Sequence, residues 1–421
     1  MGDRRDKTDG STLTLPQPSD ARRPHKLVIL ESSSSVAGVQ QTTMDIALGL
    51  DPSRWETLVA IPREGDFSGQ CQAAGLAWKI FPRPRMLSTS FWTGNKRKLP
   101  NPFAWVWNVA AIFVAASRTA GFLRRERPDV VMTKGLVCHF YGGLASKKLG
   151  IPCIWHTEDF VSERFGGIYR FVFGQFAIRL PSHIVTISRS LFRQVPPAAK
   201  TRASVATNGI DTRLFRPGRC GSKIREEFGL AADAMVIGNV SRLTPWKGQH
   251  LLIEAFARVA QNNDRAHLVL VGAALFGGVS YERNLRGQVA RLGLSNRVTF
   301  TGNRNDVRDL LAAMDIFAYT AVEKDAWPLS LLQAMSSGLP VIAFDIEGVR
   351  DPMGPDVQSM QLIPVGDVKV FSDSLALLAG DAARRKMLGE AARERAVQAC
   401  DIEARVKRIE GILAGLVRSP A

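Results

Sequence analysis

The sequence predicts an α/β protein built from two doubly wound domains that face each other across a cleft. Short apolar segments alternate with helical stretches along both halves of the chain, and this alternation is typical of a mostly parallel sheet covered on both faces. The chain has 421 residues, of which 45% are hydrophobic and 22% charged, so its composition is globular and its length exceeds that of one core of common size. Two such domains leave a cleft between them, where a ligand the size of a nucleotide can bind.

The formal net charge of +16 favours partners that carry negative charge: phosphorylated small molecules, nucleic acid or an anionic membrane surface. The five cysteines are scattered without a CxxC pair, which indicates a reducing compartment and no zinc site. Residues Met1 to Arg23 are polar and charged, and they lack the apolar core of a signal peptide. We therefore expect a disordered tail over residues 1–24 and a cytoplasmic protein.

The first domain is predicted over residues 25–212. Lys26 to Ser32 is its first strand, and a turn of small residues that includes Gly38 leads into a helix from about Val39 to Leu50. This turn could face a ligand, although a lone glycine is not the GxGxxG phosphate fingerprint. Further apolar segments predict more strands. They are Trp55–Ile61, Ala77–Phe81, Val130–Lys134, Pro152–His156, His183–Ser188 and Ala203–Ile210.

One segment of this domain carries charge of a single sign. From Phe67 through Arg125 there is no Asp or Glu, whereas the span contains nine basic residues. They are Lys79, Arg83, Arg85, Lys96, Arg97, Lys98, Arg118, Arg124 and Arg125. Aromatic residues are interleaved with them, including Phe91, Trp92, Phe103, Trp105, Trp107 and Phe113. The stretch from Phe103 to Ala116 is apolar except for Asn108, is shorter than a bilayer requires, and is interrupted by Arg118.

Two interpretations of this segment remain open. It could be a helix that packs on the sheet and is preceded by a solvated basic loop. It could also be an interfacial anchor, with Lys and Arg side chains on anionic headgroups and Trp at the boundary of the bilayer. We favour an anchor from Lys79 to Arg125, because every charge in the span has one sign. Nucleic-acid binding is not expected, because no nucleic-acid motif accompanies the charge.

A linker without a periodic pattern, Asp211 to Gly218, leads into a second α/β series over residues 213–400. Its predicted strands are Met235–Val240, His267–Val271, Val298–Thr301, Ile316–Thr320, Val341–Phe344 and Gln361–Ile363. Its predicted helices are Gly248–Gln261, Tyr281–Leu292, Asp306–Met314 and Pro328–Ser337, with two more after the last strand. A last helix, Ile402 to Val417, occupies most of residues 401–421.

The stretch from Tyr319 to Arg350 contains the first candidate for a site. Glu323 and Asp325 follow a strand, and Pro328 stands where a proline is favoured, in the first turn of a helix. Carboxylates between the carboxyl end of a strand and a helix suggest a small-molecule site, because ligands bind in that crevice in open α/β sheets. The first turn of the helix also offers unpaired N–H groups to an anion. The alternative is an ordinary βαβ unit with a solvated acidic loop.

Two cations follow another strand of the same predicted sheet. Arg242 and Lys247 lie between the strand Met235–Val240 and the next helix. An arginine can hold a diphosphate by a fork of N–H groups, and a lysine can hold it as a point charge. Taken singly, each residue could be a solvated charge. Together with the acidic loop they predict a nucleotide-diphosphate site, with cations for the phosphates and carboxylates for sugar hydroxyls.

Several ordered segments make the sequence similar to a known family. They are IPCIWHTEDF, NGIDTRLFRP, SRLTPWKGQHLLIEAF, FTGNRNDVRDLLAAMDIFAYT and DAWPLSLLQAMSSGLPVIAF. They resemble the retaining glycosyltransferases of family four, whose GT-B fold has two Rossmann-like domains, and the resemblance runs from Lys26 to the last helix. It implies a metal-independent hexosyltransferase without a cofactor. Such an enzyme moves a sugar from a nucleoside-diphosphate sugar to an acceptor hydroxyl with retention of the anomeric configuration.

The resemblance also implies roles for individual residues. His156, Arg242, Lys247 and Asp325 would be catalytic, with His156 facing the donor sugar and the two cations on the diphosphate. The other implied donor contacts are Gly38, Asn303, Arg304, Glu323, Pro328, Leu329, Ser330, Leu331 and Gln333. Of these, the backbone near Asn303 and Arg304 would meet the base, and Pro328–Leu331 would present a helix amino terminus to the phosphates. The last helix would cross back to brace the first domain.

The sequence departs from the family pattern near the donor. The family has two glutamates with seven residues between them, and here those positions hold Asp325 and Gln333. Asp is one methylene shorter than Glu, and the neighbouring Glu323 could take its place at the sugar hydroxyls. Gln333 can still hydrogen-bond a ribose, but without charge assistance. The family's glycine pairs are also incomplete at Gly38 and Gly348, so we expect an altered donor affinity or preference.

Polar residues after the fifth strand of the first domain need a separate interpretation. A histidine at a strand end is often structural, but the position of His156 in the family motif favours a functional role. His139 is a further candidate near the cleft. Glu158 and Asp159 have no motif of their own, and we interpret them as charges of a loop.

The leading hypothesis is an active glycosyltransferase, peripheral on the inner face of the cell membrane. It would act on a lipid-linked or membrane-proximal glycan in the biosynthesis of a cell-surface polysaccharide or glycolipid. The alternatives are a soluble transferase for a small metabolite and a non-catalytic protein that binds nucleotide sugars. A sugar-nucleotide epimerase is disfavoured, because the linker and the Lys247 motif match the transferases better.

Overall fold

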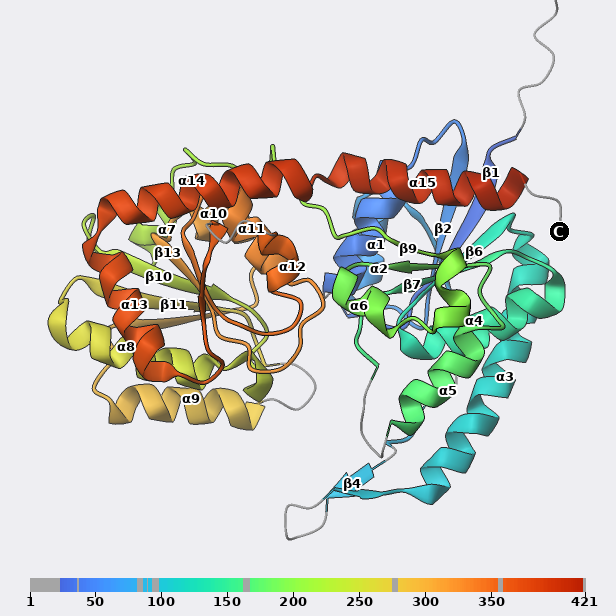
Figure 1. The fold of residues 1–421 in the computed structure, drawn as a ribbon, viewed down its shortest axis with the longest axis horizontal. Coiled ribbons are helices and arrows are strands. Elements are labelled where there is room, and N and C mark those ends of the chain that lie inside the picture. The colour runs from blue at the N-terminus through green and yellow to red at the C-terminus, as the bar shows by residue number, and fades with distance from the viewer. Residues whose placement is uncertain are drawn as a thin grey trace, which may run out of the picture.

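Two parallel β-sheets, each covered by helices, form the two halves of the molecule (Figure 1). The computed structural model describes residues 23–35, 38–81, 86–88, 90–92, 98–161, 167–274, 279–354 and 359–418. Nearly all of the predicted tail over residues 1–24 lies outside these ranges, as do Arg83, Arg85, Lys96 and Arg97 of the basic segment.

The first sheet has seven parallel strands in the order β3-β2-β1-β6-β7-β8-β9. They are β1 (His25–Leu30), β2 (Trp55–Ile61), β3 (Ala77–Ile80), β6 (Val130–Lys134), β7 (Cys153–Thr157), β8 (His183–Thr186) and β9 (Ala203–Val205). Its central strands contain unbroken apolar runs, Leu27–Leu30 and Val130–Met132, in which every side chain is fully buried. Such runs are expected where a parallel strand is covered on both faces.

The second sheet has six parallel strands in the order β12-β11-β10-β13-β14-β15. They are β10 (Met235–Val240), β11 (Ala266–Val271), β12 (Val298–Gly302), β13 (Ile316–Tyr319), β14 (Val341–Phe344) and β15 (Gln361–Ile363). The predicted α/β class with two doubly wound units is therefore confirmed.

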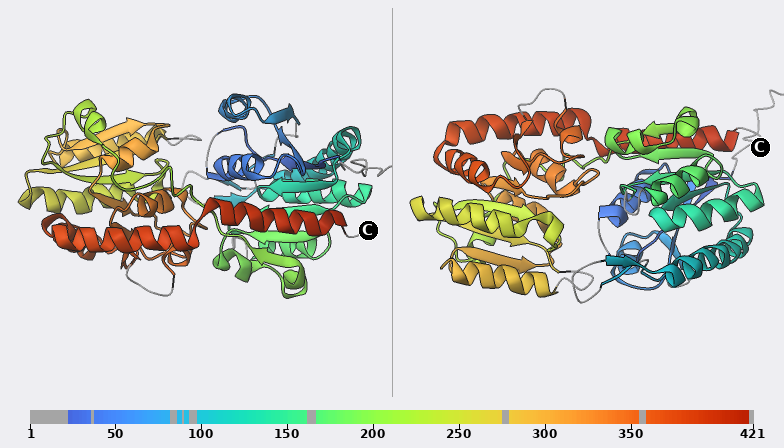
Figure 2. Two further views of the ribbon diagram at one scale, coloured as in Figure 1. Left: turned by 90° about the horizontal axis from the view of Figure 1, so that it is seen from above. Right: turned by 60° about the horizontal axis from the view of Figure 1, so that its bottom comes forward.

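Helices cover both sheets (Figure 2). In the first half they are α1 (Gly38–Gly49), α2 (Asp66–Ala73), α3 (Pro102–Glu126), α4 (Leu136–Leu149), α5 (Ile168–Ala177), α6 (Arg189–Gln194) and a 3-10 helix at Pro197–Arg202. In the second half they are α7 (Ser222–Glu227), a 3-10 turn at Pro245–Lys247, α8 (Gln249–Asn262), α9 (Val279–Arg291), α10 (Val307–Ala312), α11 (Leu329–Ser336), α12 (Arg350–Met353), α13 (Val368–Gly380) and α14 (Ala382–Ala399).

The last helix, α15 (Ile402–Arg418), crosses back from the second half to the first (Figure 1). Its apolar side chains Val406, Ile409 and Leu413 are buried in the core beneath the first sheet. Glu410 accepts a hydrogen bond from the Trp55 indole at 3.2 Å. The predicted bracing of the first domain by the last helix is confirmed.

The segment between β3 and β6 differs from the prediction. A short antiparallel pair, β4 (Ser90–Trp92) and β5 (Lys98–Pro100), precedes α3. Asn101 caps α3 by accepting a hydrogen bond from the Ala104 N–H at 3.1 Å, and Arg127 ends it in a left-handed conformation with φ 50°. The helix therefore runs for 25 residues and continues past Arg118. The helix is thus longer than the apolar stretch Phe103–Ala116, and by length and composition alone it could cross a bilayer, as could the core helix of a soluble protein.

The strand order reverses between β1 and β6 in the first sheet and between β10 and β13 in the second. We call these two places the switch points. In open α/β sheets ligands bind outside the carboxyl ends of the strands at such a point, because the connections leave in opposite directions and open a crevice.

Candidate active site

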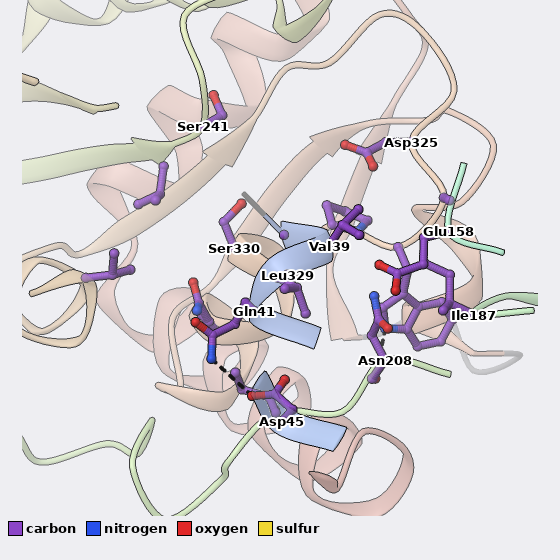
Figure 3. Close-up of a pocket in the computed structure, with 18 of the residues that line it drawn as sticks. Val39, Gln41, Asp45, Glu158, Ile187, Asn208, Ser241, Asp325, Leu329 and Ser330 are labelled. Carbon is purple, nitrogen blue, oxygen red and sulfur yellow. Dashed lines mark hydrogen bonds between the residues drawn. The ribbon is translucent and has the colours of Figure 1, made fainter. Parts of the chain in front are cut away.

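The carboxyl ends of strands from both sheets open into one cleft between the two halves (Figure 3). Residues after β1, β7 and β8 line its first wall, and residues after β10, β11, β12 and β13 line its second wall. The volume of the cleft is about 2000 Å³, whereas a typical small-molecule pocket has about 300–1,000 Å³. The cleft therefore has room for two ligands at once.

Two loops of the second wall are held against each other at the switch point. Gly248 has a left-handed backbone with φ 69°, and a Cβ added there would lie 2.0 Å from the Thr320 carbonyl oxygen. The Val322 N–H donates to the Trp246 carbonyl at 2.8 Å, and the Thr320 hydroxyl donates to the Lys247 carbonyl at 3.2 Å. The loop after β10 and the loop after β13 therefore form one continuous wall.

Lys247 is buried in this wall and is not a solvated cation. Its ammonium group donates to Asp325 Oδ2 at 2.5 Å and to the Tyr319 hydroxyl at 2.7 Å, and that hydroxyl donates to the same carboxylate. Burial lowers the pKa of Lys247, and the charge of Asp325 offsets part of this effect. Burial would raise the pKa of Asp325, but Lys247 and Tyr319 hold it below its usual value. Lys247 and Asp325 are therefore an ion pair with no net charge.

Arg242 lies on the same loop without such a partner. No carboxylate of the described residues lies within 4 Å of its guanidinium, and the centroid of the Trp246 ring is 5.9 Å from it. Arg242 is therefore a charge on this wall that is available to an anionic ligand.

Helix α11 begins at the same wall. Pro328 precedes the helix as its cap instead of lying in its first turn. The N–H groups of Leu329 and Ser330 have no acceptor among the described residues. Leu331, which was predicted as a donor contact, is fully buried, and its N–H donates to the Pro328 carbonyl at 3.1 Å. Helix α1 begins opposite at Gly38, where an added Cβ would lie 3.7 Å from Leu329 Cδ1, so both domains aim a helix amino terminus at the cleft (Figure 3).

The turn after β14 supports the Asp325 loop from behind. The Asp325 N–H donates to the Glu347 carbonyl at 3.1 Å. Gly348 has φ 98°, and a Cβ added there would lie 1.6 Å from the Asp325 carbonyl oxygen. A single glycine at position 348 is therefore sufficient for this close approach.

Glu158 belongs to the first wall, and its interpretation as a loop charge is wrong. Its side chain is nearly fully buried, 2.5 Å from the Lys134 ammonium, and it accepts a hydrogen bond from the Thr42 hydroxyl at 2.7 Å. Burial would raise the pKa of Glu158, but Lys134 and His156 hold it far below its usual value. Asp159 is open to solvent in the cleft, yet surrounding protein, Glu158 and Asp325 raise its pKa.

His156 is fully buried behind Glu158, and its side chain does not line the cleft. Its Nδ1 lies 2.9 Å from Glu158 Oε1 without the alignment of a hydrogen bond, and its Nε2 lies 3.5 Å from Arg405 Nη2. Burial and the charge of Lys134 lower the pKa of His156 to about 4, so the ring is neutral near pH 7. Because a guanidinium can only donate, Nε2 accepts and Nδ1 carries the proton. In this structure Glu158 and Asp159 line the cleft, and the imidazole of His156 lies behind them.

His139 is also remote from the cleft. Its ring stacks on Trp155 with 5.0 Å between the centroids, and Nδ1 hydrogen-bonds the Thr133 hydroxyl at 2.8 Å. Burial lowers the pKa of His139 to about 3. This histidine is a satisfied core residue.

The other predicted donor contacts line the second wall. Glu323 and Asn303 are exposed, and Gln333 is half-buried on α11. The guanidinium of Arg304 is held by Glu227 and Asp306 at 2.5 and 2.6 Å. Within the described part of the chain, no group of three His, Cys, Asp or Glu side chains could hold a metal ion.

Comparison with known families agrees with this geometry. A model of the family described as Glycosyltransferase Family 4 matches residues 36–214, and a model described as Glycosyl transferases group 1 matches residues 222–395. The chain belongs to glycosyltransferase family 4. The first match covers most of the first sheet with its helices, and the second covers the second sheet.

Curated relatives of this glycosyltransferase include three bacterial enzymes. It is 24% identical to the UDP-Gal:alpha-D-GlcNAc-diphosphoundecaprenol alpha-1,3-galactosyltransferase of Escherichia coli over 70% of this chain and 77% of the relative. It is 24% identical to the lipopolysaccharide core biosynthesis mannosyltransferase LpsB of Rhizobium meliloti over 51% of this chain and 61% of the relative. It is 30% identical to the D-inositol 3-phosphate glycosyltransferase of Stackebrandtia nassauensis over 47% and 45%. The chain thus matches about half to three quarters of the length of these relatives.

Solved structures confirm the GT-B fold of this glycosyltransferase. Anabaena HepE in complex with UDP-glucose superposes with a TM-score of 0.78 and 26% identity, over 93% of this chain and 99% of that one. WaaG, a glycosyltransferase involved in lipopolysaccharide biosynthesis, superposes with a TM-score of 0.67 at 18% identity, over 93% and 100% of the two chains, which shows the fold alone.

Sequence reasoning missed residues of the first wall of this glycosyltransferase. Glu158 could have been found by the rule that identified Asp325, since it directly follows a parallel strand near a switch point. Lys134 and Arg405 had no such signal, because they come from β6 and from α15, and only the fold brings them together around His156.

Proposed function

We propose that this glycosyltransferase binds a UDP-sugar on the second wall of the cleft and transfers its sugar to a hydroxyl of a glycan or glycolipid acceptor on the first wall. The observation that carries the proposal is Arg242, a guanidinium without a carboxylate partner at a switch point where α11 presents free N–H groups. Uridine is proposed as the base because HepE was solved with UDP-glucose at 26% identity, and the Escherichia coli relative is named for UDP-Gal.

The proposed chemistry depends on charge stabilisation. When the nucleoside diphosphate departs, negative charge develops on the β-phosphate. Arg242 and the N–H groups of Leu329 and Ser330 would stabilise this charge. They would take the part that a metal ion plays in other transferases, so the proposed reaction needs no metal. Asp325 would accept hydrogen bonds from sugar hydroxyls, in the orientation that Lys247 gives it.

We propose that the anomeric configuration is retained. In a front-face reaction the incoming hydroxyl attacks from the side on which the phosphate leaves, and a phosphate oxygen takes the proton of that hydroxyl. No enzyme nucleophile is then required. Proton NMR of the first product formed would give the anomer, and an inverted product would rule this mechanism out.

The acceptor is proposed to be lipid-linked or membrane-proximal, and the protein to be peripheral on the inner face of the cell membrane. Two of the relatives are named for substrates or pathways of this kind, diphosphoundecaprenol and the lipopolysaccharide core. Asp159 on the first wall is open to solvent, none of the described residues donates a hydrogen bond to its carboxylate, and it would accept one from an acceptor hydroxyl.

A donor screen tests this proposal. The protein is incubated with UDP- and GDP-sugars in the presence of EDTA and without an acceptor, and released nucleoside diphosphate is counted. We expect slow hydrolysis of one UDP-sugar, which falls by about 10²–10³-fold in Arg242→Ala because one stabilising donor is lost. Arg258→Ala, which removes an exposed arginine of α8 outside the cleft, is the matched control and should be unchanged.

The screen also separates the alternatives. If only a GDP-sugar were hydrolysed, the donor base would be guanine and not uracil. If hydrolysis required an added divalent ion, the proposed reaction would not be metal-independent. Flat traces with every donor, together with no thermal shift by UDP or GDP, would favour a non-catalytic protein. In that case the loss of activity would be explained by Gln333, which stands in place of the family's second glutamate.

A further inference from the structure

Helix α3 is built with its large and small apolar residues on unexpected sides. Up to Ala120 its buried side consists of small residues, namely Ala104, Ala111, Ala115, Ala116, Thr119 and Ala120, whereas the buried Phe122 and Leu123 near its end are large. Its outward side carries large apolar residues, namely Phe103, Val106, Trp107, Val109, Phe113 and Val114. Phe103 is 67% exposed and Val106 is 72% exposed. A helix that faces only water would gain stability from the reverse arrangement, because burying a large apolar side chain is favourable by about 1.5–3 kcal/mol.

Helix α5 extends this outward surface. It lies next to α3 along one edge of the molecule (Figure 1), and the Trp105 ring stacks on Tyr169 with 5.1 Å between the centroids. Ile168 and Phe171 of α5 are exposed, Phe171 by 66%. We call the outward residues of α3 and α5 together the α3–α5 face. Exposed large apolar side chains that gather on two neighbouring helices are a feature that often marks an interaction site.

The charged side chains of α3 are arginines up to its last residue, Glu126. Arg118, Arg124 and Arg125 are exposed on α3, and no acidic residue occurs from Phe67 to Arg125. Lys79 contributes less, because Glu126 accepts a hydrogen bond from its ammonium at 2.7 Å. A surface with large apolar residues and exposed arginines complements a bilayer with anionic headgroups, which offers an apolar interior beneath negative charge.

We propose that the α3–α5 face docks this protein onto an anionic lipid bilayer. The alanine side of α3 packs against α4, so the helix lies in the plane of the membrane surface and does not cross it. By its rise it would extend along the surface for about 37 Å. The docking itself does not require the proposed function. Its role, to bring a lipid-linked acceptor to the first wall of the cleft, rests on that function.

Flotation with liposomes tests the docking. The protein is mixed with vesicles of phosphatidylcholine alone or with phosphatidylglycerol added, and the floated fraction is measured. The apolar variant combines Val106→Ser, Phe113→Ser and Phe171→Ser, which remove exposed side chains of both helices. We expect its membrane affinity to fall by about tenfold or more for each side chain removed. A control with Leu377→Ser, Met387→Ser and Val397→Ser removes equally apolar, exposed side chains of α13 and α14 and should float like the parent.

A charge variant separates headgroup attraction from insertion. Arg118→Gln, Arg124→Gln and Arg125→Gln should lower affinity for anionic vesicles by about fivefold for each arginine and should leave neutral vesicles unaffected. A control of the same charge change uses Arg283→Gln, Arg384→Gln and Lys386→Gln, which are exposed on α9 and α14. Salt should weaken binding of the parent and have little effect on the charge variant.

Each outcome is decisive. Failure of the parent to float, or equal flotation of the apolar variant and its control, would overturn the docking. Sedimentation that shows a parent dimer, dissociated by the apolar variant, would overturn it in favour of a second copy on this face. Thermal shift by UDP is measured for every variant, so that loss of the fold or of the donor site is separated from loss of docking. A protein that floats but binds no donor would refute the proposed function and leave the docking intact.

Discussion

The crevices at the two switch points have the same topology and each holds an ion pair, but they differ in the charges beside that pair. In the first domain, Glu31 follows β1 and Lys134 ends β6; both are fully buried, and Lys134 lies 2.5 Å from Glu158. Glu31 accepts hydrogen bonds from its own helix α1 through Gln40 and Thr43. In the second domain, the crevice between β10 and β13 holds an ion pair, and beside it Arg242 has no carboxylate partner among the described residues.

The difference between the two crevices separates structural charges from ligand-binding charges. A buried charge that its neighbours satisfy leaves no group for a ligand. Removal of one partner lowers the stability of the fold, because the other charge stays buried and unpaired. A cation left without a partner in a cleft gains one when an anion binds. We therefore expect changes in the first crevice to alter stability and changes in the second to alter donor binding. Arg405 connects the first crevice to α15 through His156, so this structural network also holds the two domains together.

The largest effect is expected for Lys134→Met. If this change affected only donor binding, the structural role of the first crevice would be refuted. Removal of this ammonium leaves Glu158 charged, buried and without its ion-pair partner, so the free energy of unfolding should fall by about 3–5 kcal/mol. Urea unfolding followed by circular dichroism measures this loss. Lys148→Met removes an exposed lysine of α4 and should cost little. A loss below about 1 kcal/mol in Lys134→Met would refute the structural role.

A smaller, pH-dependent effect is expected for Glu31→Gln. Burial raises the pKa of Glu31 from 4.5 to about 7. The folded protein therefore holds this proton more tightly than the unfolded chain, and the stability that it contributes below pH 4.5 is lost as the pH rises through 7. Since Gln does not ionise, the variant should gain roughly 2–3 kcal/mol relative to the parent between pH 4.5 and 8.

Urea unfolding of Glu31→Gln and of the parent at several pH values measures this difference. His139 and His156 have lowered pKa values, so each makes stability rise with pH as the unfolded chain loses its extra proton. This opposite slope is present in both proteins and cancels in the comparison. Parallel stability curves for variant and parent would show that Glu31 is already ionised in the folded protein at low pH.

The smallest effect is expected for Gln333→Glu, which tests whether residues near the second crevice contribute to donor binding. A carboxylate at this half-buried position of α11 would accept ribose hydroxyls with charge assistance, so UDP should bind about fivefold more tightly, which corresponds to about 1 kcal/mol. Isothermal titration calorimetry with UDP measures the gain, which should disappear with 2′,3′-dideoxy-UDP. Gln261→Glu on the surface of α8 controls for the added charge. Weaker binding in Gln333→Glu would place the ribose elsewhere.

The second wall of the cleft could be predicted well because its residues are local to strand ends. Arg242 and Lys247 follow β10, Glu323 and Asp325 follow β13, and parallel strands carry such residues to one edge of the sheet. The first wall could not be predicted in the same way. The burial of His156 behind Glu158 depends on Lys134 and Arg405, whose positions are set by packing between distant segments.

By itself, the sequence determined the two parallel sheets and the acidic and basic loops of the second wall, because apolar periodicity and strand-end position are local properties. Only the tertiary structure decided which charges are free. Lys247 and Arg242 are equivalent cations in the sequence, yet the first is paired with Asp325 and the second is not. The same holds for α3, whose apolar residues predict a helix but not the side that stays outside, because burial depends on the elements that pack against it and not on composition.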